Sequence, residues 1–317
     1  MSSPSFNAVN YSLRPSKTIQ RGVVFEGLRQ LQEDLDWSRA TYLGFGSIWF
    51  TDFVLAHRVL RITRMVSVEC HPIGFRRAQF NKPYSFVRVK EGLSLDVIPE
   101  LYREARFPTH PIIAWLDYDA ELDLNKVDEL RFMVENAQPD SVLLVTFDVS
   151  EKRYGSSIDE RRDELRNLFG RAMPVNLGKA ALRGAGLART LAKMTEGLLK
   201  STSVRMRKEN GCELAFRIAY RDKATMLTIG AVFPSAQNRA ATRKRIRSAK
   251  WAGVIDGIIE APHLTFKEAS ALQAALPLHG GMNRTRVQNL GFDLEYNQIE
   301  AFSEYYRYYP TFAQVVG

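Results

Sequence analysis

The sequence predicts an α/β fold built on a doubly wound, mostly parallel sheet, with an antiparallel hairpin at one edge and a small helical region at the C-terminal end. Two patterns support this fold class. Short apolar segments alternate with amphipathic helical segments between about residues 15 and 150, and such alternation is typical of parallel sheets covered by helices on both faces. Two longer apolar segments then flank a short polar turn within residues 213–233, which is the pattern of a hairpin.

The first half of the chain carries the alternation. A flexible tail is expected at residues 1–14, followed by apolar residues at helical spacing in 17–32, and two further helices are predicted at 48–60 and 124–137. Five short apolar runs predict the strands, which are 40–44, 65–69, 85–90, 111–117 and 141–147.

The second half has a different character. Residues 158–208 are predicted to form a basic helical insertion, after which the hairpin joins 213–220 to 225–233. Thr265 and Glu268 have the spacing of a capping box, and Asn297 with Glu300 is expected to open a last helix. The aromatic residues of that helix are expected to pack against the domain; they are Phe302, Tyr305, Tyr306 and Tyr309. We therefore expect one α/β domain at 15–235, followed by a basic segment and a small helical region at 236–317.

The composition excludes several classes of protein. Of the 317 residues, 45% are hydrophobic and 25% are charged, values close to the averages for globular proteins. No apolar run approaches the about 20 residues of a membrane span, and the first residues lack the apolar core of a signal peptide. Cys70 and Cys212 are too few for a disulfide framework or a cysteine-rich zinc site, so a reducing, cytoplasmic compartment is expected.

The positive charge is concentrated in one part of the chain. Residues 171–250 carry 18 Lys and Arg against 4 Asp and Glu, whereas the segments on either side are slightly acidic. Such a block is an electrostatic footprint for phosphate groups, which makes RNA or DNA a candidate partner. The candidate contacts are Arg243, Lys244, Arg245 and Arg247. The alternative is a set of solvated helix faces.

Chemistry-bearing residues follow the predicted strands. In a doubly wound sheet, ligands bind beyond the carboxyl ends of the strands, near the point where the strand order reverses. The candidate binding residues at these ends are Gly44, Phe45, Gly46, Ser47, Glu69, Glu91 and Gly92. Glycines let the backbone approach a ligand, a helix N-terminus favours a negative group, and a carboxylate accepts hydrogen bonds from both hydroxyls of a ribose. We therefore predict a nucleoside site in which Glu69 binds the ribose, although these residues do not name the nucleoside.

Several well-defined motifs are absent from the sequence. A dinucleotide-binding fingerprint would need glycine or alanine in place of Trp49, which counts against NAD and FAD. The chain also lacks a phosphate-loop pattern, an H-E-x-x-H motif and a G-x-S-x-G elbow. Nucleotide hydrolysis, a histidine metal site and serine hydrolysis therefore lose support.

The element order and the strand-end residues resemble those of class I S-adenosylmethionine-dependent methyltransferases. Residues 42–47 (Tyr-Leu-Gly-Phe-Gly-Ser) stand where that family has its glycine-rich loop, and Glu69 stands where it has the ribose-binding acid. Residues 115–119 (Trp-Leu-Asp-Tyr-Asp) stand where the family has the motif that follows the fourth strand, beside the transferred methyl group. In such a site, Glu91 would lie near the adenine amino group. Tyr42 and Ile48 depart from the pattern, because they replace the usual acidic residue of the loop and its third glycine. The stretch also resembles a bacterial group labelled O-methyltransferase.

The resemblance implies a Rossmann-like fold, S-adenosylmethionine as the cofactor and methyl transfer as the activity. Transfer to a hydroxyl needs an in-line nucleophile and a base or a metal ion that removes the proton. Asp117 and Asp119 are the candidate catalytic residues, and their surroundings do not match the Asn/Asp-Pro-Pro-Tyr motif used for exocyclic base amines. The segments also resemble those that hold Mg²⁺ in catechol-type O-methyltransferases, but only Asp148 follows the fifth strand where an Asp-Asn pair is usual. Mg²⁺ is therefore the less favoured alternative, and no metal site is predicted.

Two functions from different classes stay open. The first is methyl transfer, favoured toward oxygen, to an acceptor that the sequence does not identify and that includes nucleic acid. The second is a catalytically inactive methyltransferase-like subunit that binds nucleic acid or protein. Glu69 and Asp117 favour the enzyme, whereas Tyr42 and Ile48 in the glycine loop favour the binding subunit. An oligomer or a protein complex is compatible with both.

Overall fold

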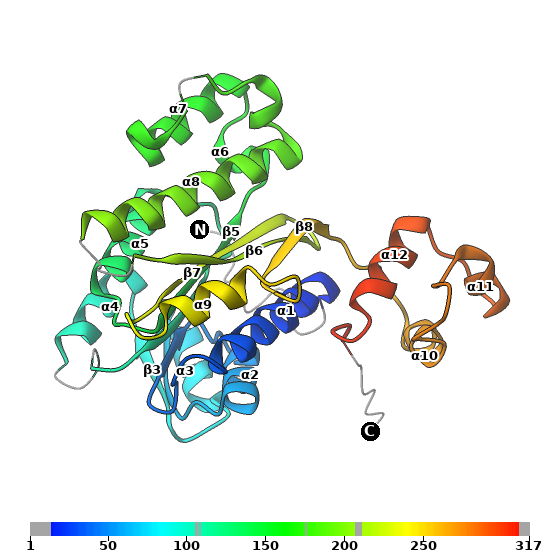
Figure 1. The fold of residues 1–317 in the computed structure, drawn as a ribbon, viewed down its shortest axis with the longest axis horizontal. Coiled ribbons are helices and arrows are strands. Elements are labelled where there is room, and N and C mark those ends of the chain that lie inside the picture. The colour runs from blue at the N-terminus through cyan, green and yellow to red at the C-terminus, as the bar shows by residue number, and fades with distance from the viewer. Residues whose placement is uncertain (1–13, 105–106, 108, 175, 207–210, 311–317) are drawn as a thin grey trace.

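The centre of the fold is an eight-stranded sheet with the strand order β3-β2-β1-β4-β5-β7-β6-β8 (Figure 1). The structure is a computed structural model that describes residues 14–104, 107, 109–174, 176–206 and 211–310. The strands are β1 (Thr41–Gly44), β2 (Arg64–Glu69), β3 (Val87–Glu91), β4 (Ile112–Asp117), β5 (Ser141–Asp148), β6 (Glu213–Arg221), β7 (Thr225–Phe233) and β8 (Val254–Ile259). The helices that surround the sheet are α1 (Pro15–Gln32), α2 (Thr51–Leu60), α3 (Pro72–Asn81), α4 (Ser94–Arg103), α5 (Leu124–Asn136), α6 (Glu151–Tyr154), α7 (Ile158–Phe169), α8 (Gly184–Arg205) and α9 (Arg239–Ile246).

The first five strands pair as the sequence pattern predicts. They run parallel, so that Tyr42 of β1 lies opposite Met65 of β2 on one side and Ile113 of β4 on the other. β7 is antiparallel to both β5 and β6. All of β5 is buried, because helices cover both faces of the sheet. The predicted α/β Rossmann-like fold with a doubly wound, mostly parallel sheet is thereby confirmed.

The structure extends the sheet beyond the predicted hairpin. β8 pairs in parallel with β6 and forms the edge, the place expected for the hairpin itself. Its sequence, Val-Ile-Asp-Gly-Ile-Ile, lacks a strand signal because Asp256 and Gly257 interrupt the β-branched residues. The domain boundary expected at residue 235 therefore falls between β7 and β8 of the same sheet. The helices α3 and α4 were also not predicted, and each contains a proline, Pro72 at the start of α3 and Pro99 inside α4.

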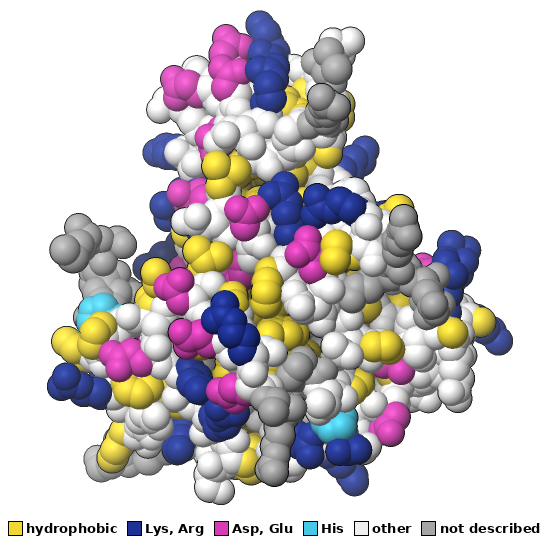
Figure 2. All heavy atoms as spheres, turned by 90° about the vertical axis from the view of Figure 1, so that its left-hand side faces the viewer, with side chains coloured by type: hydrophobic (Ala, Val, Ile, Leu, Met, Phe, Trp, Pro, Cys, Tyr) yellow, Lys and Arg dark blue, Asp and Glu magenta, His cyan; other side chains and the backbone are white. Residues whose placement is uncertain are grey.

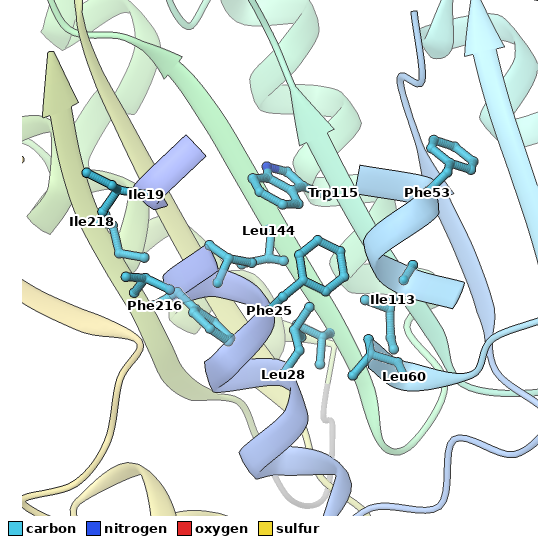
Figure 3. Packing of buried hydrophobic residues seen from close by; sticks show 14 of the residues in the cluster. Ile19, Phe25, Leu28, Phe53, Leu60, Ile113, Trp115, Leu144, Phe216 and Ile218 are labelled. Atoms are coloured by element: carbon cyan, nitrogen blue, oxygen red, sulfur yellow. The ribbon is translucent and has the colours of Figure 1, made fainter. Parts of the chain in front are cut away.

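Each face of the sheet has its own hydrophobic core. Side chains alternate along β1, so that Tyr42 faces the helices α1 and α2 while Leu43 faces α4, α5 and α8. On the first face, Phe25 and Leu28 of α1 pack over Trp115 and Leu144, as Figure 3 shows. This burial fixes α1 across the sheet, with its N-terminal end at the carboxyl ends of the strands.

A helical region follows β8 and forms the right-hand lobe of Figure 1. It consists of α10 (Phe266–Ala274), α11 (Arg284–Asn289) and α12 (Tyr296–Tyr305). The predicted capping box of Thr265 and Glu268 is present at the start of α10. The start predicted for α12 was wrong, because Glu295 and Gln298 form its capping box.

The aromatic residues at the end of α12 are partly a core. Phe302 and Tyr309 are buried with ring centroids 5.0 Å apart, as expected, whereas Tyr305 and Tyr306 are half-buried. The expected flexible tail at 1–14 lies outside the described residues except for Arg14. Among the described helices, none combines the length and the apolar character needed to cross a membrane.

Candidate functional site

A cleft of about 250 Å³ opens at the carboxyl ends of the parallel strands. Most of the predicted site residues line it together: Phe45, Gly46, Ser47, Glu69, Gly92, Asp117 and Asp119. Two do not line it. Gly44 is buried behind the loop, and Glu91 is an exposed residue at the end of β3. The strand-end argument therefore located the cleft, although it missed the wall that α1 and α2 contribute.

The β1–α2 loop is tight, and its shape depends on glycine. A Cβ on Gly46 would stand 2.5 Å from the Phe50 ring and 2.9 Å from Ser67 Oγ, and one on Gly44 would stand 3.0 Å from the Trp115 carbonyl oxygen. The Gly46 N–H donates to Ser67 Oγ at 3.0 Å, and Ser47 has a positive φ of 51°. The loop therefore presents bare backbone to the cleft immediately before α2 begins.

Glu69 ends β2 and is half-buried at the cleft. Its Oε1 accepts a hydrogen bond from the His71 N–H at 3.0 Å. Burial raises the pKa of the Glu69 carboxyl, and the His71 N–H opposes that shift. A carboxylate at this position can accept hydrogen bonds from donors of a ligand, such as vicinal hydroxyls.

Asp117 is held by a lysine from a distant part of the chain. Lys17 Nζ of α1 lies 2.7 Å from Asp117 Oδ2, and the two side chains are 4% and 16% exposed. Asp117 Oδ1 is buried without a hydrogen-bond partner among the described residues. One oxygen of the predicted catalytic carboxylate is thus occupied by Lys17, whereas the other makes no hydrogen bond within the described part of the chain.

Contacts with the second half of the chain fix the position of α1. The Asp222 carboxylate, in the β6–β7 turn, accepts hydrogen bonds from the N–H groups of Ser16 and Lys17 at 3.0 and 3.1 Å. Inside the sheet, Gln20 Nε2 donates to Thr228 Oγ1 at 2.8 Å. Lys17 and Arg21, both buried, therefore face the cleft from a helix that is anchored at its first turn.

Asp52 is a further carboxylate at the cleft, and the strand-end argument missed it. It lies in the first turn of α2, lines the cleft, and accepts a hydrogen bond from the Tyr42 hydroxyl at 2.8 Å. Burial raises the pKa of Asp52, whereas the nearby positive charge of Arg21 opposes the shift. The acid absent from the loop at Tyr42 is thus present beside it, in the first turn of α2. The Thr51-Asp52 pair directly after the loop was the available sequence signal.

Tyr118 and Asp119 complete the opposite wall. Tyr118 is buried with its ring 5.4 Å from that of Phe45, and Asp119 is exposed at the rim. Burial, with Glu129 beside the hydroxyl, raises the pKa of Tyr118. Ser94 donates to Glu129 Oε2 at 2.8 Å and itself lines the cleft.

The carboxylate that the Mg²⁺ alternative required points elsewhere. Asp148 is buried away from the cleft, where it accepts hydrogen bonds from the Ser150 N–H at 2.8 Å and Arg153 Nε at 3.1 Å. Across the described residues, no group of three His, Cys, Asp or Glu side chains is arranged to hold a metal ion.

The basic segment is partly neutralised within the fold. Arg243 Nε donates to Glu213 Oε1 at 2.9 Å, and Arg245 pairs with Asp34 and Glu33 at the end of α1. Lys244 and Arg247 are exposed. Figure 2 shows a face on which basic and acidic side chains are likewise interspersed. The charge excess along the chain therefore overstates the charge that α9 presents to a partner.

The comparisons with known proteins agree with this architecture. A family model described as "Putative O-methyltransferase" matches residues 9–317. Among solved structures, the fold is similar to O-methyltransferase TomG from Streptomyces achromogenes in complex with SAM, at 15% identity over 72% of this chain and 91% of that one, with a TM-score of 0.40. It is also similar to an O-methyltransferase from Bacillus cereus in complex with SAH, at 14% identity over 69% and 92%, with a TM-score of 0.39. No curated protein matches the chain.

Proposed function

Because the chain belongs to the O-methyltransferase family whose model it matches over residues 9–317, we propose that the cleft binds S-adenosylmethionine and that the methyl group passes to an acceptor oxygen beside Asp117. The observation that carries this proposal is the convergence of the glycine loop, Glu69 and Asp117 on one cleft of about 250 Å³.

The residues of the cleft suit this cofactor. Gly46 leaves bare backbone where a Cβ has no room, and Ser47 Oγ is buried without a hydrogen-bond partner among the described residues. Glu69 would accept the two ribose hydroxyls. Asp52 would hold the methionyl ammonium in the role that the loop lacks at Tyr42, and Arg21 would balance the methionyl carboxylate.

A carboxylate of the cleft would accept the proton of the acceptor hydroxyl. The bound cofactor would supply an electrophilic methyl group on its sulfonium. As the acceptor oxygen forms its bond to that carbon and the sulfur–carbon bond breaks, the hydroxyl proton must leave. Asp117 Oδ1, which has no hydrogen-bond partner among the described residues, would take it, and Lys17 would stabilise the negative charge on the acceptor oxygen. Asp119, at the rim, would orient the acceptor.

Nucleic acid is the acceptor or partner that the basic block at residues 171–250 favours. Lys244 and Arg247 are its exposed candidates on α9. If phosphates bind there, Lys244→Gln with Arg247→Gln should weaken RNA binding, and affinity should fall steeply with salt. Reversing Arg243 or Arg245 would be a poorer test, because the new carboxylates would face Glu213 and Asp34. Equal gel shifts for wild type and variant would leave the block as surface charge.

Two further expectations accompany the proposal. The free thiols of Cys70 and Cys212 support a reducing compartment such as the cytoplasm. The alternative of an inactive binding subunit, alone or in a complex, is supported by Tyr42 and Ile48 in the loop.

Calorimetry with a matched pair of variants tests the cofactor assignment. Glu69→Ala removes both hydroxyl acceptors and should weaken S-adenosylmethionine binding by about 1.5–3 kcal/mol. Glu91→Ala, at the neighbouring strand end but outside the cleft, is the control and should bind like wild type. Equal affinity in both variants would reject the site. Tight binding without transfer to any hydroxyl would favour the inactive subunit.

A further inference from the structure

A second opening, of about 200 Å³, lies on the other face of the sheet between α8 and the last strands. We call it the α8 slot. Its floor consists of Ala188 and Ala192 of α8, Ala219 of β6, Leu227 of β7 and Ile258 of β8. It shares no lining residue with the cleft. Figure 1 shows α8 running along the sheet toward the edge strand β8.

Two independent features keep the slot open. The first is side-chain size, because three alanines face the space where α8 crosses the strands, and each is buried. The second is the path of β8. Arg217 lies opposite Val254 and Ala219 opposite Ile258, so two steps along β6 correspond to four along β8. This bulge contains Gly257, which has a φ of +98°. Bulges are over-represented beside binding sites, where they re-aim the chain.

The floor is suited to an apolar group of modest size. A cavity of about 150 Å³ lined by aliphatic side chains is large enough for benzene, so the slot has room for a ring or a short alkyl chain. Leu227 is 2% exposed and Ala192 is 3% exposed, which makes the floor a continuation of the core on this face. Among the described residues, no aromatic side chain lines the slot, and stacking of a nucleobase would need one.

The rim of the slot carries three basic side chains and one acidic one, Asp256. Arg189 and Lys193 are exposed one turn apart on α8, and Arg217 of β6 joins them. Arg217 Nη1 lies 3.8 Å from Glu196 Oε1, and Arg217 Nη2 lies 3.6 Å from Asp256 Oδ1. The Arg217 side chain is 42% exposed. The pair with Asp256, whose side chain is 97% exposed, contributes little, and the long contact with Glu196 is weak at 3.8 Å, so Arg217 would yield to an incoming anion.

We propose that the α8 slot is a binding site for a small amphiphilic carboxylate, with its alkyl or aryl group on the alanine floor and its carboxylate between Arg189, Lys193 and Arg217. This assignment does not depend on the cofactor cleft. The ligand is a small molecule because the volume of the slot holds one ring or short chain, and because the charge of the slot is confined to its rim.

Calorimetry with octanoate as the probe tests the proposal. We expect octanoate to bind wild type, and octyltrimethylammonium, with the same chain and the opposite charge, to bind at least about tenfold more weakly. Ala192→Leu fills the floor, and Ala185→Leu fills the mouth from an exposed position of α8. Both should reduce octanoate affinity at least about tenfold. Ala241→Leu, exposed on α9 and outside the slot, is the matched control and should leave it unchanged.

The charge requirement has its own control on the same helix. Arg189→Gln with Lys193→Gln should weaken octanoate binding, while Lys200→Gln, exposed on α8 but outside the slot, should not. Octanoate binding that survives Ala185→Leu, or equal binding of the cationic amphiphile, would overturn the proposal. So would an oligonucleotide that binds this face while octanoate does not. S-adenosylmethionine affinity of the slot variants should equal that of wild type, so failure here is distinguishable from failure of the proposed function.

Discussion

Removing Lys17 should expose how strongly the fold depends on its ion pair with Asp117. Lys17→Met keeps the unbranched stem and deletes the ammonium, leaving Asp117 without its partner at 2.7 Å. Breaking a buried pair by removing one member costs about 3–5 kcal/mol. Lys17 is 4% exposed, but Asp117 is 16% exposed, so water reaches the carboxylate. We therefore expect a loss of about 2–3 kcal/mol in the free energy of unfolding, measured by urea denaturation.

A double-mutant cycle separates the ion pair from packing. Asp117→Asn alone removes the carboxylate that the buried ammonium contacts, whereas the double variant removes both charges. The double variant should lose less unfolding free energy than the two single variants lose together, by about 2 kcal/mol. The exposed pair of Arg88 and Glu104, with side chains 51% and 35% exposed, is the control and should couple by less than about 1 kcal/mol. Additive effects in the Lys17 cycle, or a coupling no larger than the control, would refute the reasoning.

Three further outcomes are expected. Burial raises the pKa of Asp52, so its contribution to stability is present below its ordinary pKa of 3.8 and is lost as pH rises through the raised value. Asp52→Asn should flatten this decline in urea denaturation curves recorded across that pH window. Parallel pH profiles for wild type and variant would contradict the assignment. Gly46→Ala should destabilise the fold by about 1–3 kcal/mol, because its Cβ would stand 2.5 Å from the Phe50 ring, whereas an unchanged urea midpoint would show that the loop relaxes. Once an acceptor is known, Asp117→Asn should lower kcat by about 10²–10⁴-fold with little change in cofactor affinity, and retained turnover would remove Asp117 from the proton-transfer role.

The predictable part of the site is the part that local sequence encodes. An apolar run followed by a polar residue marks both a strand and its end, which is why Glu69 and Asp117 were found. The same logic overreached at Glu91, since β3 ends one residue before the chain turns at Gly92, which has a φ of 137°. That turn leaves Glu91 exposed and brings Gly92 to the cleft instead.

The sequence did not reveal which residues form contacts when they lie far apart along the chain. Along the chain, the run around α9 contains no acid, but Arg243 meets Glu213, 30 residues away, and Arg245 meets Asp34, 211 residues away. Charge counted in a window therefore measures the segment and not the surface. The strand β8 was missed for a related reason, because its bulge replaces the alternation that marks a strand.

The wall contributed by α1 shows how the two halves of the chain build one site. The parallel strands provide the side of the cleft that carries the glycine loop and Glu69, and their residues are local to the first 150 positions. The wall formed by Lys17 and Arg21 depends on a helix that begins where Asp222 of the β6–β7 turn accepts its first N–H groups. The hairpin thus acts on the cleft through α1, although Asp222 does not line the cleft itself. Loss of Asp222 would therefore leave the glycine loop and Glu69 in place and release the helix that positions Lys17 against Asp117.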